Sequence, residues 1–170
     1  MPEIAKEHSL PLVRFGLGLG SMSEPTPLVL ALQRTVAAPA GAVWTALTTP
    51  ALMRRWMLVP AVVVPEAPLA PGSRIEWPDD AGEPYLAGTV TACEPLHRPT
   101  VDLQDRSWPR PARAGEATWS FELTEAAGTT RIDYRLGDLA LDPEGQAWLA
   151  AYAEANEPAR LAAVVQASMP

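Results

Sequence analysis

Side chains that often carry out catalysis or bind metal ions are few and scattered in this chain. The two histidines, His8 and His97, lie far apart, and the one cysteine, Cys93, has no histidine at a spacing typical of a nucleophile and its base. Zinc sites built on histidine and cysteine need several such ligands that converge. The sequence therefore predicts no metal site and no cofactor, and we interpret Cys93 as a small apolar side chain buried on a strand.

Acidic residues are the remaining candidates for acid–base chemistry. Asp79 and Asp80 fall in a predicted turn, and Asp102 and Asp105 flank a predicted loop, so we expect these carboxylates to be solvated. Glu76 and Asp102 would become polar groups of an interior site if their strands turned them inward, but the strand register leaves that orientation open. The sequence also lacks the G-x-S-x-G motif of a hydrolase nucleophile. These features favour a non-catalytic protein.

Aromatic residues are the most distinctive side chains of the sequence. Six tryptophans against two phenylalanines is a high count for a small domain. All the tryptophans except Trp108 fall at predicted core-facing positions, and Trp44 is the best candidate for a purely structural one. The others either fill the core or line a space that holds an apolar ligand, and the sequence leaves both interpretations open. The candidates for ligand contact are Trp56, Trp77, Tyr85, Trp119, Tyr134 and Trp148.

Arginines form one basic cluster on an otherwise acidic chain. Arg106, Arg110 and Arg113 lie in a proline-rich segment, residues 106–115, that is predicted to be a long loop, and Arg98 is nearby in the sequence. A solvated loop is the usual outcome for such a segment. The functional alternative is a gate that attracts an anionic ligand or the acidic surface of a partner protein.

Length and composition limit the classes of function. A chain of 170 residues, 48% of them apolar, has the size of one domain and can bury a substantial core. The net charge of −7 argues against a nucleic-acid partner, because phosphate binding requires a concentrated basic surface. A single cysteine fits a reducing compartment, so we expect a cytoplasmic location. No apolar run approaches the roughly 20 residues of a membrane-spanning helix.

Residues 1–27 differ from the rest of the chain and are expected to form a flexible N-terminal extension. They lack the basic and apolar regions of a signal peptide. The segment Gly16–Ser21 resembles a phosphate-binding loop only superficially, since Pro25 and Pro27 prevent the helix that must follow such a loop. An alternative is that translation starts at Met22.

Hydrophobic periodicity and turn residues predict the order of the structural elements. Alternation predicts a strand over residues 28–37, and helical spacing then predicts one short helix from Pro39 and a second capped by Thr49. A final helix is predicted to begin with Asp142 as its N-cap and to break or kink at residues 156–158. The intervening strands are predicted at residues 62–64, up to Trp77, 85–93, 99–103, 117–124 and 131–136, the last two as a hairpin.

The segment TVAAPAGAVWTALTTPALMRRWM, residues 35–57, resembles the opening signature of the activator-of-heat-shock-ATPase-like family, within the START-like helix-grip (SRPBCC) superfamily. Four weaker segments follow in the order the family would place them: APGSRIEW, AGTVTACEPLHRPT, ATWSFELTEAAGTTRIDY and QAWLAAY. The resemblance implies an α+β helix-grip fold for residues 28–170. In that fold a curved antiparallel sheet of about six to seven strands carries two short helices after strand 1 and a C-terminal helix packed across it. The family usually ends in one long helix, so Pro158 is a departure.

The resemblance also implies a function, which is the non-catalytic binding of a small hydrophobic or amphipathic molecule in a cavity between the sheet and the C-terminal helix. Two alternatives stay open. One is a protein-interaction module similar to the chaperone activators, with a filled core and a protein as its partner. The other is an enzyme of the cyclase or hydrolase type that uses polar groups inside the cavity.

Overall fold

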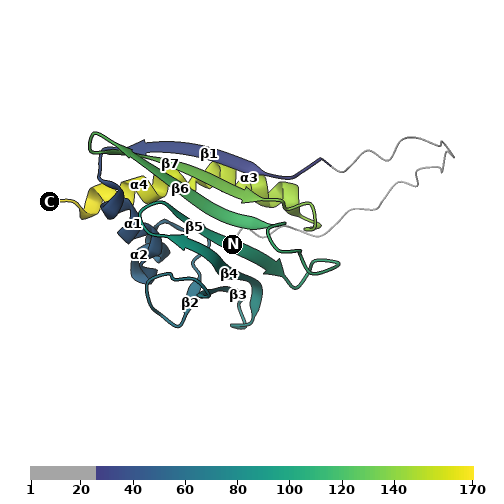
Figure 1. The fold of residues 1–170 in the computed structure, drawn as a ribbon. Coiled ribbons are helices and arrows are strands. Elements are labelled where there is room, and N and C mark those ends of the chain that lie inside the picture. The colour runs from purple at the N-terminus through teal and green to yellow at the C-terminus, as the bar shows by residue number, and fades with distance from the viewer. Residues whose placement is uncertain (1–25) are drawn as a thin grey trace.

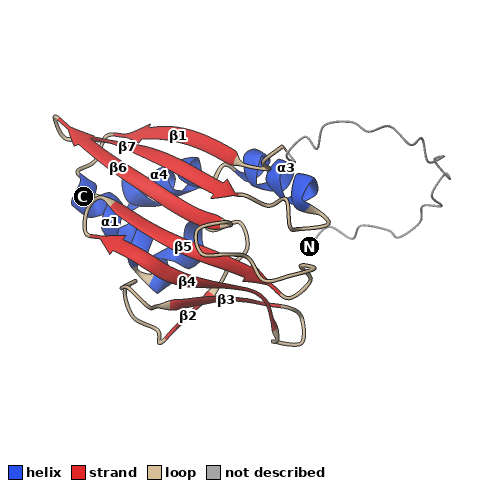
Figure 2. Ribbon diagram, turned by 45° about the vertical axis from the view of Figure 1, so that its right-hand side comes forward, coloured by secondary structure: helices blue, strands red, loops and turns tan. Residues whose placement is uncertain are grey.

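The computed structural model describes residues 26–170, which form one antiparallel sheet (Figure 1) with helices on one of its faces (Figure 2). The sheet has seven strands in the order β1-β7-β6-β5-β4-β3-β2. The strands are β1 (Leu30–Val36), β2 (Val62–Val64), β3 (Arg74–Pro78), β4 (Pro84–Glu94), β5 (Arg98–Asp105), β6 (Thr118–Ala126) and β7 (Thr129–Gly137). The helices are α1 (Ala40–Thr48), α2 (Pro50–Trp56), α3 (Gly145–Ala155) and α4 (Glu157–Ser168). The predicted helix-grip fold is confirmed.

Residues 1–25 lie outside the described part of the chain, and with them His8, the segment Gly16–Ser21 and most of the predicted N-terminal extension. Between residues 26 and 170, no helix has the length and apolar character needed to cross a bilayer.

The β6–β7 hairpin supplies much of the inner face, which we define as the face of the sheet that the helices cover. Trp119 and Phe121 are buried on this face in alternation with exposed or half-buried residues, as predicted. Ala127 and Gly128 join the strands with φ values of 53° and 76°, and positive φ at both central residues is what a tight two-residue hairpin turn requires. Phe121 lies opposite Tyr134, and their ring centroids are 5.1 Å apart.

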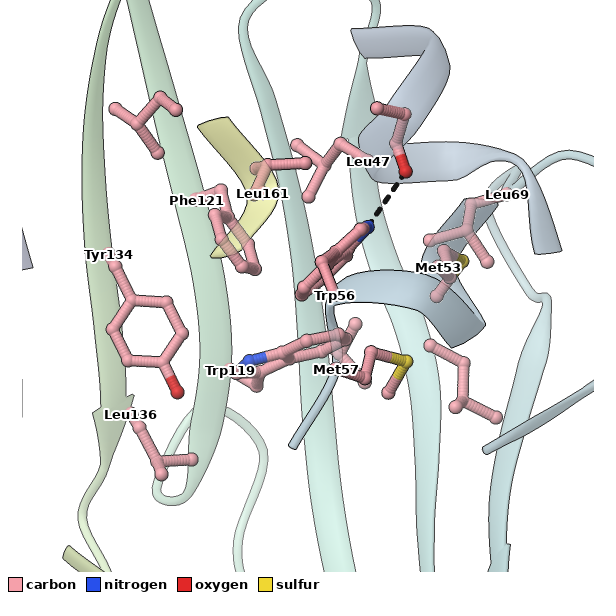
Figure 3. Close-up of a cluster of buried hydrophobic side chains, with 14 of the residues drawn as sticks. Leu47, Met53, Trp56, Met57, Leu69, Trp119, Phe121, Tyr134, Leu136 and Leu161 are labelled. Atoms are coloured by element: carbon pink, nitrogen blue, oxygen red, sulfur yellow. Dashed lines mark hydrogen bonds between the residues drawn. The ribbon is translucent and has the colours of Figure 1, made fainter. Parts of the chain in front are cut away.

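Two short helices follow β1 and cover one end of the inner face. α2 begins at Pro50 after Thr49, as predicted, whereas Pro39 precedes α1 instead of being its first helical residue. Trp56 is fully buried, and its indole Nε1 donates a hydrogen bond to the carbonyl oxygen of Ala46 at 2.9 Å (Figure 3). This bond fixes α2 against α1.

Trp44 is only half-buried, so the prediction that it is the most purely structural core residue is wrong. Helix α1 turns Val43, Ala46 and Leu47 into the core. The residue directly after Val43 lies about 100° further around the helix, which points Trp44 toward the rim. Trp44 packs against the core from its edge.

The C-terminal helix is divided into two, as the sequence predicts. Asn156 has φ 50° and ψ 67°, which ends α3, and its Oδ1 accepts a hydrogen bond from the N–H of Ala159 at 3.2 Å, which caps α4. Pro158 therefore stands in the first turn of a new helix, where a missing N–H costs little. α3 begins at Gly145, three residues later than Asp142, because residues 142–144 form a turn in which Asp142 Oδ1 accepts from the N–H of Glu144 at 2.8 Å.

Gly88 on β4 offers a test of how tightly the inner face is packed. A Cβ atom at this buried position would lie 2.4 Å from Cγ1 of Val101 and 3.5 Å from Cζ3 of Trp77. We expect Gly88→Ala to lower the free energy of unfolding by about 1–3 kcal/mol, since the added methyl group overpacks the core. The matched control is Gly41→Ala in α1, where no neighbouring atom of the described residues lies within 4 Å of the added Cβ.

The measurement is urea denaturation of both variants followed by tryptophan fluorescence. Gly41→Ala should leave the stability unchanged or raise it by up to about 1 kcal/mol. Equal stabilities of the two variants would contradict the close packing of Gly88 on β4 against Val101 on β5.

Candidate functional site

Glu157, the first residue of α4, carries a carboxyl group in the interior of the protein and is only 1% exposed. Its Oε1 accepts a hydrogen bond from the backbone N–H of Leu58 at 2.9 Å. Its Oε2 accepts from the hydroxyl of Tyr134 at 3.0 Å and from Nε1 of Trp119 at 3.3 Å. In Figure 3 the polar atoms of Tyr134 and Trp119 lie on the same side of the aromatic cluster. A buried carboxyl group needs such partners, because burial without them is costly.

Burial raises the pKa of Glu157, and hydrogen bonds from Leu58, Tyr134 and Trp119 together with the charge of Arg160 oppose that shift without cancelling it. Burial, followed by the nearby Glu157, also raises the pKa of the Tyr134 hydroxyl well above its usual value, and the same two causes act on Tyr152. Both tyrosines therefore remain neutral hydroxyl groups in any physiological buffer. The interior site combines one carboxyl group with hydroxyl and indole donors.

Two small cavities lie between α3 and the inner face of the sheet. The inner cavity has a volume of about 20 Å³ and includes Glu157, Trp77 and Trp119 in its wall. The outer cavity has a volume of about 40 Å³ and is lined partly by Tyr85, Trp108 and Trp148. Both are also lined by Leu86, Leu103, Leu136 and Tyr152, so they are adjacent. Their size is close to that of one or two water molecules, and the space under α3 is thus largely filled.

A larger hollow of about 570 Å³ lies on the outer face of the sheet. Charges of both signs line it, with Arg98 and Arg135 near Glu122 and Asp133, and the side chains come from β1, β5, β6 and β7. This hollow is open to solvent and has no aromatic cluster. We therefore place the candidate site at the interior cavities, where aromatic side chains and a buried carboxyl group meet.

Of the six aromatic residues predicted for ligand contact, four are buried in the core, Tyr85 and Trp148 are half-buried against it, and only some line the cavities. Trp77 and Trp119 line the inner cavity, and Tyr85 and Trp148 line the outer one. Trp56 stacks on Trp119 with ring centroids 5.8 Å apart and reaches neither cavity. Tyr134 likewise lies outside both cavities and enters the site through its hydroxyl bond to Glu157.

Sequence reasoning missed Glu157, Trp108 and, as a site residue, Tyr152. An acidic residue at the start of a helix is usually solvated and interacts favourably with the helix dipole, so nothing local indicated that Glu157 is buried. Trp108 lies in the loop of residues 106–115, which we call the arginine-rich loop. It is nevertheless buried, and its Nε1 donates a hydrogen bond to Oδ2 of Asp142 at 3.0 Å. A tryptophan in a Pro/Arg loop was the one available signal for this anchor.

Glu76 and Asp102 lie on the outer face and do not contribute to the interior site. Ile75 and Trp77 point inward on β3, so Glu76 between them points outward, where it pairs with Arg74. By the same alternation Asp102 points outward on β5, and its Oδ2 accepts from the N–H of Gly115 at 2.9 Å. Strand parity decides both orientations.

Cys93 is half-buried, its Sγ donates to the carbonyl oxygen of Leu69 at 3.3 Å, and burial raises its pKa. A thiol with these properties is a poor nucleophile. Across residues 26–170, no three His, Cys, Asp or Glu side chains are grouped so as to hold a metal ion.

The arginine-rich loop is held by ion pairs within the domain. Arg106 pairs with Asp79 at 2.8 Å, and Arg110 pairs with Glu116 at 2.6 Å. The Arg110 guanidinium, together with the N–H of Arg113, lowers the pKa of Glu116 to about 2. Arg98 and Arg113 make no ion pair with any residue in the 26–170 range. Much of the predicted basic cluster is therefore neutralised.

The sequence profile of the Activator of Hsp90 ATPase homolog 1-like proteins matches residues 37–164. The chain belongs to this family. The segment on which the resemblance was based, residues 35–57, overlaps the start of the match. None of the curated proteins compared with the chain matches it.

Solved structures share the fold at low sequence identity. Protein MLL2253 of Mesorhizobium loti superposes with a TM-score of 0.64 at 19% identity, over 84% of this chain and 99% of that one. The Aha1 dimer of Colwellia psychrerythraea gives a TM-score of 0.56 at 16% identity, over 78% of this chain and 92% of that one. A protein of Rhodobacter sphaeroides gives a TM-score of 0.54 at 27% identity, over 84% of this chain and 92% of that one. The first two likenesses concern the fold alone.

The pH dependence of stability tests the state of Glu157. Because its pKa is raised from 4.5 in the folded protein, the folded state keeps a proton above pH 4.5 that the unfolded chain has released. The difference in free energy of unfolding between the wild type and Glu157→Gln should therefore change with pH. The wild type should lose up to about 1.4 kcal/mol per pH unit relative to the variant as pH rises above 4.5, until the pH exceeds the pKa of Glu157 in the folded protein.

The measurement is urea unfolding between pH 4.5 and pH 7.5. Glu83→Gln, which alters an exposed glutamate in the β3–β4 turn, is the control and should keep the wild-type slope. Identical slopes in the wild type and Glu157→Gln would show that burial does not perturb this carboxyl group.

Proposed function

We propose that this Hsp90-activator-homologue-like protein binds one small, mostly apolar molecule between α3 and the inner face of the sheet, without catalysis. The observation that carries the proposal is the wall of the two adjacent cavities. Aromatic side chains from β3, β4, β6, α3 and the arginine-rich loop converge there, together with a few polar groups that include the buried carboxyl of Glu157. An apolar space with a few convergent polar groups is the usual form of a small-molecule site. Membership of the family is compatible with a ligand-binding or activator module.

Helix α3 is the element that would move to admit the ligand. Gly145 is the only fully buried residue of α3, and the apolar side chains of this helix, Trp148, Leu149 and Tyr152, are half-buried. The helix ends at Asn156, whose left-handed conformation separates it from the well-buried α4. Pockets for drug-sized ligands have volumes of about 300–1,000 Å³, far above the present volumes. The proposal therefore requires α3 to move away from the sheet when the ligand enters.

The small cavity volumes favour a second candidate, a protein-interaction module with a filled core. In that case the aromatic cluster stabilises the fold, and a protein partner binds elsewhere on the surface, at α1 and α2 or at the arginine-rich loop. The internal ion pairs of Arg106 and Arg110 make the loop a weaker partner site for an acidic surface. The two candidates differ in whether the space under α3 opens for an apolar molecule.

The test is a titration with N-phenyl-1-naphthylamine, a neutral probe that fluoresces in apolar surroundings. We expect saturable 1:1 binding, with Kd on the order of 1–100 µM, since burial of about 300 Å² contributes roughly 7 kcal/mol before the costs of association. Leu86→Trp should abolish binding, because Leu86 lines both cavities and a larger side chain fills them.

Val62→Trp is the matched control, since Val62 is 47% exposed on the edge strand β2 and distant in the sheet order from the aromatic hairpin. This variant should bind the probe like the wild type. Absence of binding to the wild type, or equal binding to Leu86→Trp and Val62→Trp, would overturn the proposal and favour the interaction module.

A further inference from the structure

We infer that the bound molecule is uncharged and presents a hydrogen-bond acceptor, such as a ketone or aldehyde oxygen, to the indole N–H of Trp77; this inference rests on the proposed binding function. Two independent features of the cavity wall support it. One is an indole donor without an acceptor, and the other is the sign of the charges that surround the space under α3.

Trp77 is the exception among the buried tryptophans. The indole N–H of Trp56 donates to Ala46, that of Trp108 to Asp142, and that of Trp119 to Glu157. Trp77 is 3% exposed, and its Nε1 is buried with no hydrogen-bond partner in the 26–170 region. A buried donor left without an acceptor costs about 1–3 kcal/mol, and native structures rarely leave one without a reason.

The position of Trp77 gives that reason. Its side chain lines the inner cavity, next to Trp119, with ring centroids 6.0 Å apart in an edge-to-face arrangement. Gly88 on the neighbouring strand lies beside its ring, since a Cβ there would be in ordinary van der Waals contact with Cζ3 of Trp77 at 3.5 Å. A ligand oxygen that lies beside Trp77 when α3 has moved away would satisfy this donor, and the apolar wall would cover the rest of the molecule.

The charges of the wall decide the sign of the ligand. Glu157 lines the inner cavity, and Asp105 and Asp142 line the outer one. Among residues 26–170, no arginine or lysine lines either cavity. An anion would lose its hydration and lie close to Asp105 and Asp142, carboxyl groups of like charge, which is unfavourable at low dielectric. The cavity therefore disfavours carboxylates and phosphates, and a neutral acceptor is the class that fits both features.

The experiment uses three probes of nearly the same shape: acetophenone, α-methylstyrene and benzoate, which carry a carbonyl, a methylene and a carboxylate at the same place. Binding to the ¹⁵N-labelled full chain is followed through the indole N–H signals, and the Trp77 signal is assigned as the one lost in Trp77→Phe. We expect acetophenone to shift that signal downfield. Acetophenone should bind about fivefold tighter than α-methylstyrene, the value of one net hydrogen bond of about 1 kcal/mol, and at least tenfold tighter than benzoate.

In Trp77→Phe the ratio of the affinity for acetophenone to the affinity for α-methylstyrene should fall to about one. Because the ratio compares two probes on the same variant, a change in cavity size affects both and cancels. Trp44→Phe, at a half-buried position outside both cavities, is the control and should keep the wild-type ratio. If Trp77→Phe does not fold, the three affinities of the wild type decide the matter.

The outcomes separate the inference from the function on which it rests. Equal binding of acetophenone and α-methylstyrene, or tightest binding of benzoate, overturns the inference and leaves the binding function standing. Binding of N-phenyl-1-naphthylamine without binding of acetophenone at millimolar concentration also overturns it. Failure of all three probes together with N-phenyl-1-naphthylamine overturns the proposed function itself.

Discussion

The carboxyl group of Glu157 joins parts of the chain that lie far apart in the sequence. Its partners are the N–H of Leu58, 99 positions away, and the side chains of Trp119 and Tyr134, 38 and 23 positions away. These bonds hold the start of α4 against the segment after α2 and against the β6–β7 hairpin. Since an interior carboxyl group is tolerated only with its hydrogen bonds made, the position of every one of these elements depends on the others.

The aromatic packing around this point leaves little free space. Trp119 stacks on Trp56 and meets Trp77 and Phe121 edge to face, so one side chain of β6 connects α2, β3 and its own strand. The dense part of the interior lies beneath α1, α2 and α4. The remaining space lies beneath α3, whose side chains are only half-buried. Asn156 divides the C-terminal helix at the border between these two parts. The break thus separates a firmly packed helix from a loosely packed one.

Charged side chains are distributed differently at the surface and in the walls of the cavities. Arg106 and Arg110 of the loop pair with Asp79 and Glu116 at the surface. The walls of the cavities, as far as residues 26–170 form them, carry carboxyl groups and no basic residue. The hypothesis of an arginine gate for an anionic ligand is therefore not favoured by the geometry. The loop contributes to the interior through Trp108, which anchors it on Asp142 just before α3.

The sequence by itself determined the family, the order of the elements, the β6–β7 hairpin and the break before Pro158, because strand alternation, turn residues and proline act over a few neighbouring positions. It also identified several aromatic residues of the interior, but it missed Trp108 and could not separate those that line a cavity from Trp56 and Tyr134, which pack in the core. Only the tertiary structure decided that Glu157 is buried, that Glu76 and Asp102 face outward and that Trp77 finds no acceptor among residues 26–170. Each of these depends on which residues from distant segments meet, and on how completely their side chains fill the space between sheet and helices.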